Sequence, residues 1–224
     1  MKKIGVMVLV VCMVFALGGC NQSMIKVLNS NISEYCEDYY IGETQDYYIE
    51  LFDGEREEPY YLDGVSEKKQ RYCLIVVTPK NEAELKEDME YCVELNDKTV
   101  EGGLNLSPFD NTMSSEMELE LGKEDNIFVY IKLDTSTQVS KMNCVSKDFA
   151  LQWQDVVNTT YEKLSEDVDT LLSTHKSMEC YVQVINKSME VGKYYWCITM
   201  IFDNADKYSC IVDPMSAEIL AKNL

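Results

Sequence analysis

Apolar residues recur at intervals of three and four in two stretches of the chain, which is the spacing of one face of an α-helix. The first stretch predicts a helix over residues 24–40, which Gly42 would end. The second runs from 149 to 171, about seven helical turns, and predicts the longest amphipathic helix of the chain. Because such a helix must bury its apolar face, it requires a sheet to cover.

Runs rich in β-branched and aromatic residues predict strands between these two helices. In the N-terminal half the predicted strands cover 46–52, 59–63, 71–78 and 86–95. The last of these runs would also suit one face of a helix. Residues 116–121 and 127–133 are joined by a short polar turn and predict an antiparallel hairpin. The polar, glycine-containing stretch before it, 96–115, is expected to be a long loop.

Three further strands are predicted behind the long helix, at 180–186, 194–202 and 207–213. Pro214 is expected to open a short terminal helix, because its fixed backbone dihedral suits a first turn. The polar stretch 135–147 is interpreted as a linker between the two halves of the chain.

These elements predict an α+β fold in which antiparallel strands pack on the long amphipathic helix, as one domain or as two small subdomains. A β-rich α+β unit would cover 24–134, and a helix with a three-stranded antiparallel unit would cover 148–224. The second unit ends in "VDPMSAEIL" and is similar to PepSY and cystatin-like modules, in which a strand closes in a related pattern. Ala217 stands where those modules usually have glycine, and the resemblance implies the fold alone.

The first residues have the pattern of an export signal. Lys2 and Lys3 precede an apolar run, and small residues follow it before Cys20. The run is shorter than the roughly 20 apolar residues that a membrane-spanning helix needs. An ordinary cleaved signal with an incidental cysteine and an uncleaved short helix are the alternatives.

The four residues Leu17-Gly18-Gly19-Cys20 resemble the lipobox of bacterial lipoproteins. The resemblance implies a diacylglycerol on the Cys20 sulfur, removal of the signal peptide 1–19, and a lipidated tether over 20–23. It therefore implies a palmitate-bearing protein anchored to the extracytoplasmic face of the cell membrane. Two acyl chains hold a protein stably at a bilayer, whereas one holds it only marginally. The preference for lysine over arginine suggests a Gram-positive source.

The chain is strongly acidic, with 39 acidic and 20 basic residues and a formal net charge of −19. Loss of Lys2 and Lys3 with the signal would leave 18 basic against 39 acidic residues, a net charge of −21. Such a surface disfavours nucleic acids and attracts cationic ligands, basic peptides or calcium. A solvated acidic surface without a ligand is the simpler alternative.

Seven cysteines remain once Cys12 leaves with the signal and Cys20 carries the lipid. None forms a C-x-x-C pair, so neither a zinc ribbon nor a thioredoxin-type site is indicated. We interpret them mainly as buried small apolar residues, and one or two disulfides remain open because export removes the reducing cytosol.

The search for catalytic, cofactor-binding and metal-binding residues returns none. The single histidine, His175, is expected to lie at the end of the long helix, where a cation suits the helix dipole. The S-x-x-K pattern at 66–69 lacks a K-T-G partner, and 203–206 is predicted to be a hairpin turn rather than a calcium loop.

Paired tyrosines in the acidic segment 35–61 predict an acidic aromatic face for sugars or basic peptides. Adjacent strand residues point to opposite faces, so one ring of each pair would point inward. The tyrosine pairs of the chain lie at 39/40, 47/48, 60/61 and 194/195.

These observations favour a non-enzymatic binding or accessory module of the cell envelope, with a basic peptide or a glycan as ligand. An envelope hydrolase with an unrecognised carboxylate site is the alternative. The receptor of an ABC importer is a third possibility, which the lack of βα alternation disfavours. The sequence does not determine the oligomeric state.

Overall fold

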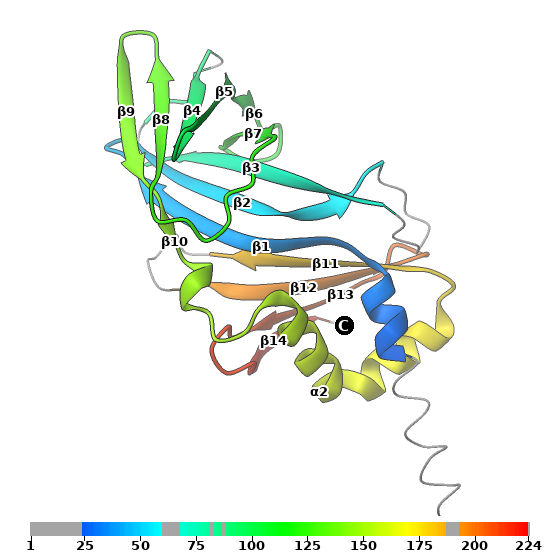
Figure 1. Ribbon diagram of the computed structural model, residues 1–224. Helices are drawn as coiled ribbons and strands as arrows, with labels where there is room; N and C mark the ends of the chain where they lie inside the picture. Colours follow the sequence, from blue (N-terminus) through cyan, green and yellow to red (C-terminus); the bar gives the residue numbers. More distant parts are fainter. Residues whose placement is uncertain (1–23, 60–67, 81–82, 87, 187–192, 224) are drawn as a thin grey trace, which may run out of the picture. The chain divides into compact units, whose positions relative to one another are not determined.

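The computed structural model describes residues 24–59, 68–80, 83–86, 88–186 and 193–223 (Figure 1). The predicted signal peptide and Cys20 lie outside these residues. The chain divides into two compact units. Unit 1 consists of Met1–Ser33, Pro59–Lys68 and Gln154–Leu224, and unit 2 of Glu34–Glu58 and Lys69–Trp153.

Unit 2 contains two antiparallel sheets (Figure 1). The first has the order β1-β2-β3-β7-β6, with the short strand β10 paired to β1. Its strands are β1 (Ile32–Glu43), β2 (Tyr47–Glu57), β3 (Lys69–Pro79), β6 (Asn105–Leu106), β7 (Met113–Met117) and β10 (Asn143–Cys144). The second sheet has the order β5-β4-β8-β9. Its strands are β4 (Glu90–Leu95), β5 (Lys98–Gly103), β8 (Ile127–Leu133) and β9 (Ser136–Lys141).

Both sheets of unit 2 contribute alternate residues to one apolar core. Ile49 and Ile75 come from the first sheet, Val93 and Val129 from the second, and all four are fully buried. This follows from the strand period of two, which sends every second side chain to the same face. A one-turn 3₁₀ helix, η1 (Ser146–Asp148), follows β10.

Unit 1 contains the helical residues 24–30, a longer helix and a meander of consecutive strands. The helix α2 (Trp153–Thr174) departs from helical geometry at Leu164, which has φ −120° and ψ 18°. The strands β11 (Met178–Ile185), β12 (Tyr195–Phe202), β13 (Lys207–Val212) and β14 (Ile219–Asn223) pair in the order β14-β13-β12-β11. Along β12 every second residue is buried, as its alternating pattern requires.

The predicted α+β class is wrong. Strands make up 52% of the structure and helices 17%, and the described residues do not show a long amphipathic helix packed against the strands. Residues 24–30 are helical, but the predicted helix over 24–40 gives way to β1 at Ile32. Within β1 the apolar residues of this pattern are Ile32, Tyr35 and Tyr39, which are β-branched or aromatic and which strands accept readily, so the helical period was misleading there.

Three other predictions differ from the structure, and one of them differs because strands pair with distant partners. The predicted hairpin of 116–121 and 127–133 does not form, because β7 pairs with β3 while β8 pairs with β4 and β9. The predicted loop 96–115 contains β5 and β6, and the predicted linker 135–147 contains β9, β10 and η1.

The expected terminal helix after Pro214 is wrong as well, because a turn leads there into β14. The strands predicted at 71–78 and 86–95 are confirmed as β3 and β4, although β4 begins later. The strands predicted at 180–186, 194–202 and 207–213 are confirmed as β11, β12 and β13. The strand predicted at 59–63 lies mostly outside the described residues.

Candidate functional site

A pocket of about 360 Å³ opens in unit 2 where β7 leaves the edge of β3. The pairing of these two strands runs from Val77 opposite Met113 to Cys73 opposite Met117. Residues 70–72 of β3 continue to pair with β2, but they lie beyond the end of β7. We call this cavity the edge pocket. It is lined by Arg56, Glu58, Gln70, Arg71, Tyr72, Glu116, Met117 and Glu118.

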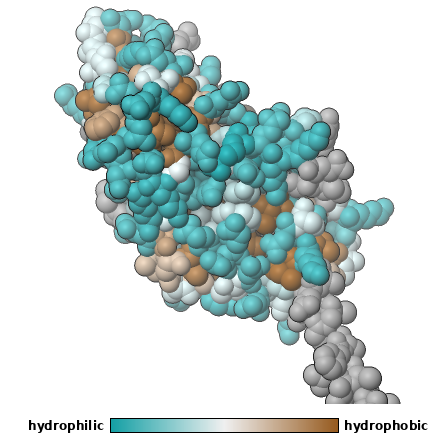
Figure 2. Space-filling view, viewed as in Figure 1, coloured by the Kyte–Doolittle hydropathy of each residue, from teal (hydrophilic) through white to brown (hydrophobic). Residues whose placement is uncertain are grey.

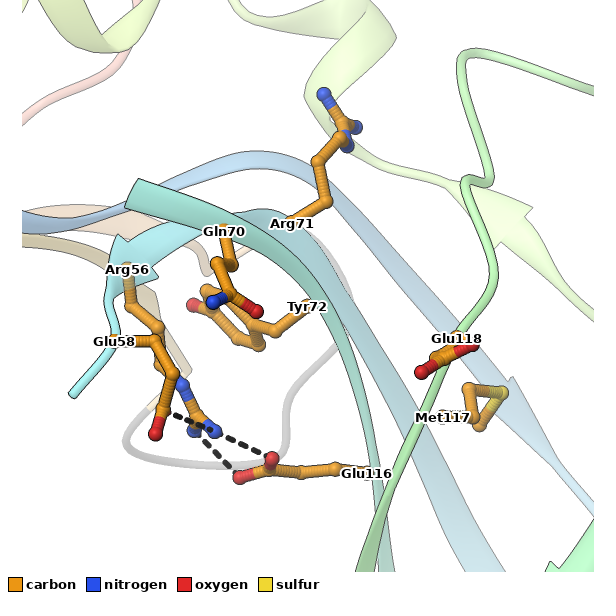
Figure 3. Close-up of a pocket in the computed structure, with 8 residues that line it drawn as sticks. All are labelled: Arg56, Glu58, Gln70, Arg71, Tyr72, Glu116, Met117 and Glu118. Atoms are coloured by element: carbon orange, nitrogen blue, oxygen red, sulfur yellow. Dashed lines mark hydrogen bonds and ion pairs between the residues drawn. The ribbon is translucent and has the colours of Figure 1, made fainter. Parts of the chain in front are cut away.

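The edge pocket lies along the side of β3 rather than on one face of the sheet. Consecutive strand residues point to opposite faces, yet Gln70, Arg71 and Tyr72 all contribute to the lining. Figure 3 shows the Arg71 side chain pointing away from the group formed by Arg56 and Glu116. A cavity that contacts residues of both orientations must follow the strand edge.

Arg56 is held at one end of the edge pocket by carboxylates. Its two terminal nitrogens each lie 2.5 Å from an oxygen of Glu116, and Glu58 lies 3.7 Å away (Figure 3). The guanidinium also lies 5.3 Å from the ring centroid of Tyr72, a cation–π arrangement. The hydrogen bonds to Glu116 raise the pKa of Arg56. Arg56 is therefore a fixed cation whose charge is already balanced.

Arg71 connects the pocket lining to a buried acid. Its Nη2 lies 2.9 Å from Asp53 Oδ2, and its Nη1 lies 2.8 Å from Glu37. Asp53 is fully buried, and the Leu121 N–H donates a second hydrogen bond to the same Oδ2 at 2.9 Å. Burial opposes the charge on Arg71, but the attraction of Asp53 and Glu37 outweighs it and raises the pKa of the guanidinium.

A β-bulge explains how Glu37 reaches Arg71. The register between β1 and β2 shifts between Cys36 and Asp38, which leaves Glu37 without a cross-strand partner in the ladder. The close approach of the two strands at the bulge requires glycine opposite Cys36. A Cβ on Gly54 would lie 2.0 Å from the Tyr35 carbonyl oxygen.

Two buried carboxyl groups lie opposite each other on β1 and β2. Asp38 pairs in register with Asp53, and Asp38 accepts a hydrogen bond from Ser146 at 3.1 Å. Burial raises the pKa of both carboxyl groups, and hydrogen bonds from Ser146, Leu121 and Arg71 oppose that shift. Neither carboxyl group lines the edge pocket, and within the described residues Asp53 Oδ1 has no hydrogen-bond partner.

The predicted acidic aromatic face is largely not at the surface. Tyr39, Tyr40 and Tyr47 are buried, and Tyr35 stacks on Trp153 with 4.1 Å between ring centroids. For the pair 39/40 the expected inward and outward alternation fails, since both rings are buried. It holds for 47/48 and 194/195, while 60/61 lies outside the described residues. Of the segment 35–61, Arg56 and Glu58 reach the edge pocket.

His175 lies just after α2, as predicted. Its Nδ1 lies 2.9 Å from Asp203, and its ring packs against Phe202 with 4.5 Å between centroids. The hydrogen bond from His175 lowers the pKa of Asp203. Residues 203–206 form the turn between β12 and β13, which confirms the predicted hairpin. This pair therefore anchors a turn in unit 1.

The cysteines of the described part of the chain are all free thiols. Six are buried and Cys197 is half-buried, which confirms their interpretation as small core residues. Burial raises the pKa of Cys210 to about 12, so that thiol is unreactive at neutral pH.

Within the described ranges, no cluster of three or more His, Cys, Asp or Glu side chains is placed to hold a metal ion. In the same ranges, no helix has the length and hydropathy needed to cross a membrane. Cys20, the predicted lipidation site, lies outside them.

Neither a protein-family model, nor a curated protein, nor a solved structure matches this chain.

The residues of the edge pocket were not predicted from the sequence. One compositional signal pointed to them, because Arg56 and Arg71 are the only arginines among the 20 basic residues of the chain and both line the pocket. Arginine is suited to bidentate pairing with carboxylates, and a chain that otherwise uses lysine has a geometric reason to place it there.

Proposed function

We propose that the protein is a lipoprotein, held by a lipid on Cys20 at the extracytoplasmic face of a bacterial cell membrane. Its folded part acts there as a non-enzymatic binding or accessory module, and its edge pocket binds a cationic group such as the side chain of a basic peptide. The lipobox-like residues 17–20 support the anchor. The composition of the edge pocket supports the ligand class.

The observation that carries the ligand class is the excess of carboxylates around the edge pocket. The lining and its direct ion-pair partners comprise two guanidiniums and five carboxyl groups. The carboxyl groups are Glu37, Asp53, Glu58, Glu116 and Glu118. The guanidiniums hold Glu116, Glu37 and Asp53, whereas Glu118 is exposed and accessible to a ligand.

The negative net charge of the whole chain also favours a cationic ligand. A net charge of −19 attracts cations over long range and raises their concentration near the surface. Figure 2 shows mostly hydrophilic residues on the visible face, with separate apolar patches. A glycan is the less favoured ligand, because Tyr39, Tyr40 and Tyr47 are buried and cannot stack on a sugar.

Titration of the full-length protein in detergent micelles with trilysine tests the ligand class. We expect trilysine to bind and triglutamate not to bind. The affinity should fall as the salt rises from about 0.01 M to about 0.15 M, because the Debye length shortens from about 30 Å to about 8 Å. Equal binding of both peptides, or binding insensitive to salt, would contradict the proposal.

The anchor is tested separately with cells that express the full-length chain in the presence of labelled palmitate. Cys20→Ala should abolish incorporation of the label, because the acylated sulfur is gone. Cys12→Ala is the matched control in the same segment and should remain labelled. Label retained by Cys20→Ala would refute the anchor.

A second candidate, an envelope hydrolase, has one observation in its favour. Asp38 and Asp53 are neighbouring buried carboxyl groups with raised pKa values, which is how a carboxyl group is prepared for acid–base chemistry. Both lie outside the edge pocket, and a catalytic acid must come within hydrogen-bond reach of its substrate. This geometry favours the binding module.

A further inference from the structure

We propose that the edge pocket binds an extended peptide by strand addition to β3, with a lysine or arginine side chain of that peptide entering the pocket. The inference deepens the proposed function and rests on it, since it names the backbone mode and the polymer class of the cationic ligand.

The first support is the geometry of the strand edge. β7 covers the edge of β3 from Val77 to Cys73 and then leaves it, so Gln70 to Tyr72 continue the strand without β7 beside them. A strand edge presents backbone N–H and C=O groups that can pair with another extended chain. Three residues span about 10 Å at about 3.3 Å each, enough for a short ladder in line with β7.

The second support is the position of the cavity beside that edge. The edge pocket is lined by Gln70, Arg71 and Tyr72, the residues that β7 leaves uncovered. A strand added there would send alternate side chains to opposite faces, so one side chain in two could enter the pocket. Strand addition obtains its affinity from backbone hydrogen bonds and its specificity from such side-chain pockets.

The third support is the chemistry along the path of the incoming side chain. Met117 and the ring of Tyr72 are almost completely buried and offer apolar surface to the methylenes of a lysine or arginine. Glu118 is exposed, so its carboxylate can receive the cationic end, whereas both oxygens of Glu116 already bond Arg56. An acidic side chain in the same place would meet like charges.

Binding and hydrogen exchange of the full-length protein with synthetic seven-residue peptides test this proposal. The probe is the capped peptide Thr-Val-Thr-Lys-Thr-Val-Thr, and a matched control carries Glu in place of Lys. Two further peptides carry N-methyl groups on alternate amides, one set for each edge of the added strand. N-methylation removes the N–H donor on that edge and leaves the side chains unchanged.

We expect the Lys peptide to bind at least fivefold more tightly than the Glu peptide. One N-methylated peptide should lose about tenfold in affinity, and the other should bind like the parent, because loss of backbone hydrogen bonds worth about 1.5 kcal/mol corresponds to that factor. Among residues 70–72, the backbone amides that point away from β2 should become protected from exchange, while those of β13 in unit 1 stay unchanged.

The outcomes separate this inference from the proposed function. If both N-methylated peptides bind as tightly as the parent, or residues 70–72 gain no protection, strand addition is overturned and binding of a cationic group stands. If trilysine binds but the Lys peptide does not, strand addition is overturned as well. If neither binds, the proposed ligand class fails and this inference fails with it.

Discussion

Glu179 of unit 1 and Asp53 of unit 2 are both buried carboxyl groups, but their hydrogen-bond partners differ in exposure. In unit 1, Glu179 is fully buried and accepts a hydrogen bond from Ser33, itself 1% exposed. In unit 2, Asp53 is equally buried, but its partner Arg71 has a side chain that is 35% exposed and lines a pocket. Glu179 thus has a buried hydrogen-bond donor, as Asp38 of unit 2 has in Ser146, whereas Asp53 is connected to the surface through Arg71.

The difference indicates that the polar pairs of unit 1 stabilise its fold, whereas those around the edge pocket of unit 2 are placed for binding. Unit 1 places polar pairs at positions that fasten turns and termini, such as the hydrogen bond between His175 and Asp203 and the ion pair of Lys222 with Asp167. In unit 2 the ion pairs of Arg56 and Arg71 lie around a cavity at the stretch of β3 that β7 does not pair with, and the other ion pairs lie elsewhere. We therefore expect changes in unit 1 to act on stability, and changes at the edge pocket to act mainly on binding.

The largest effect is expected from the core of unit 1. Trp196 is 1% exposed, so Trp196→Ala should lower the free energy of unfolding by about 3–5 kcal/mol. The neighbouring half-buried Tyr195 points to the other face of β12, and Tyr195→Ala should cost about 1 kcal/mol. Denaturant unfolding of the full-length protein measures both values. Equal costs for the two variants would show that the unit lacks a packed core.

The next largest effect is expected where a surface cation holds a buried acid. Arg71→Ala leaves Asp53 buried without its guanidinium and should cost about 2–3 kcal/mol, a value kept modest because Arg71 is partly exposed. Adding Asp53→Asn removes the stranded charge, so the double variant should recover part of the loss. Denaturant unfolding of the two single variants and the double variant gives the coupling. If the losses in the free energy of unfolding of the two single variants simply add in the double variant, Arg71 and Asp53 are not coupled and the proposed connection between pocket and core is contradicted.

Exposed ion pairs should matter much less, and by different amounts in the two units. Arg56 pairs with Glu116 through two hydrogen bonds, whereas Lys222 contacts Asp167 through one at 2.8 Å. We expect Arg56→Ala to cost less than about 1 kcal/mol of stability, and Lys222→Ala less than that. Thermal unfolding compares the two. A larger loss of stability for Lys222→Ala than for Arg56→Ala would contradict the view that the two hydrogen bonds to Glu116 make the Arg56 pair the stronger one.

The smallest effect concerns the dependence of stability on pH. Burial raises the pKa of Asp38, Glu50 and Asp53 in the folded protein. At pH values between the unfolded and the folded pKa, the folded state therefore binds more protons than the unfolded state. Stability therefore increases as the pH falls from neutral through the folded pKa values, down to the unfolded pKa of about 3.9 for Asp.

Thermal unfolding between pH 7 and pH 5 measures this increase, which reduced repulsion within the acidic chain should reinforce. Asp38→Asn keeps an acceptor for Ser146 but removes the titrating group, so it should reduce the increase. A variant with an unchanged pH profile would show that the Asp38 carboxyl group does not contribute.

The strands of unit 1 were easier to predict from the sequence than the strand pairings of unit 2. The strands β11, β12 and β13 of unit 1 were predicted because they are consecutive, alternate in polarity and pair with their sequence neighbours. In unit 2, β3 pairs with β7 through Cys73 and Met117, which are far apart in sequence. No local pattern specifies such a partner, so the predicted hairpin was placed with the wrong neighbour.

The edge pocket depends on those distant pairings and was missed for the same reason. Arg56, Arg71 and Glu116 come together because β2 and β7 flank β3, and the bulge at Cys36 and Asp38 is not visible in the periodicity of β1. The arginine usage of the chain was the available hint. The prediction of a lipid on Cys20 depends on a local motif and stays a prediction.

Two charge-matched variants test the central claim most directly. Glu118→Gln removes an exposed carboxylate at the edge pocket, and Glu218→Gln removes an exposed carboxylate from unit 1. We expect calorimetric titration of the full-length protein with trilysine to show about a fivefold loss of affinity for Glu118→Gln, corresponding to about 1 kcal/mol, and no change beyond error for Glu218→Gln. Equal losses in both variants would show that trilysine senses the net charge of the chain and would contradict a binding site at the edge pocket.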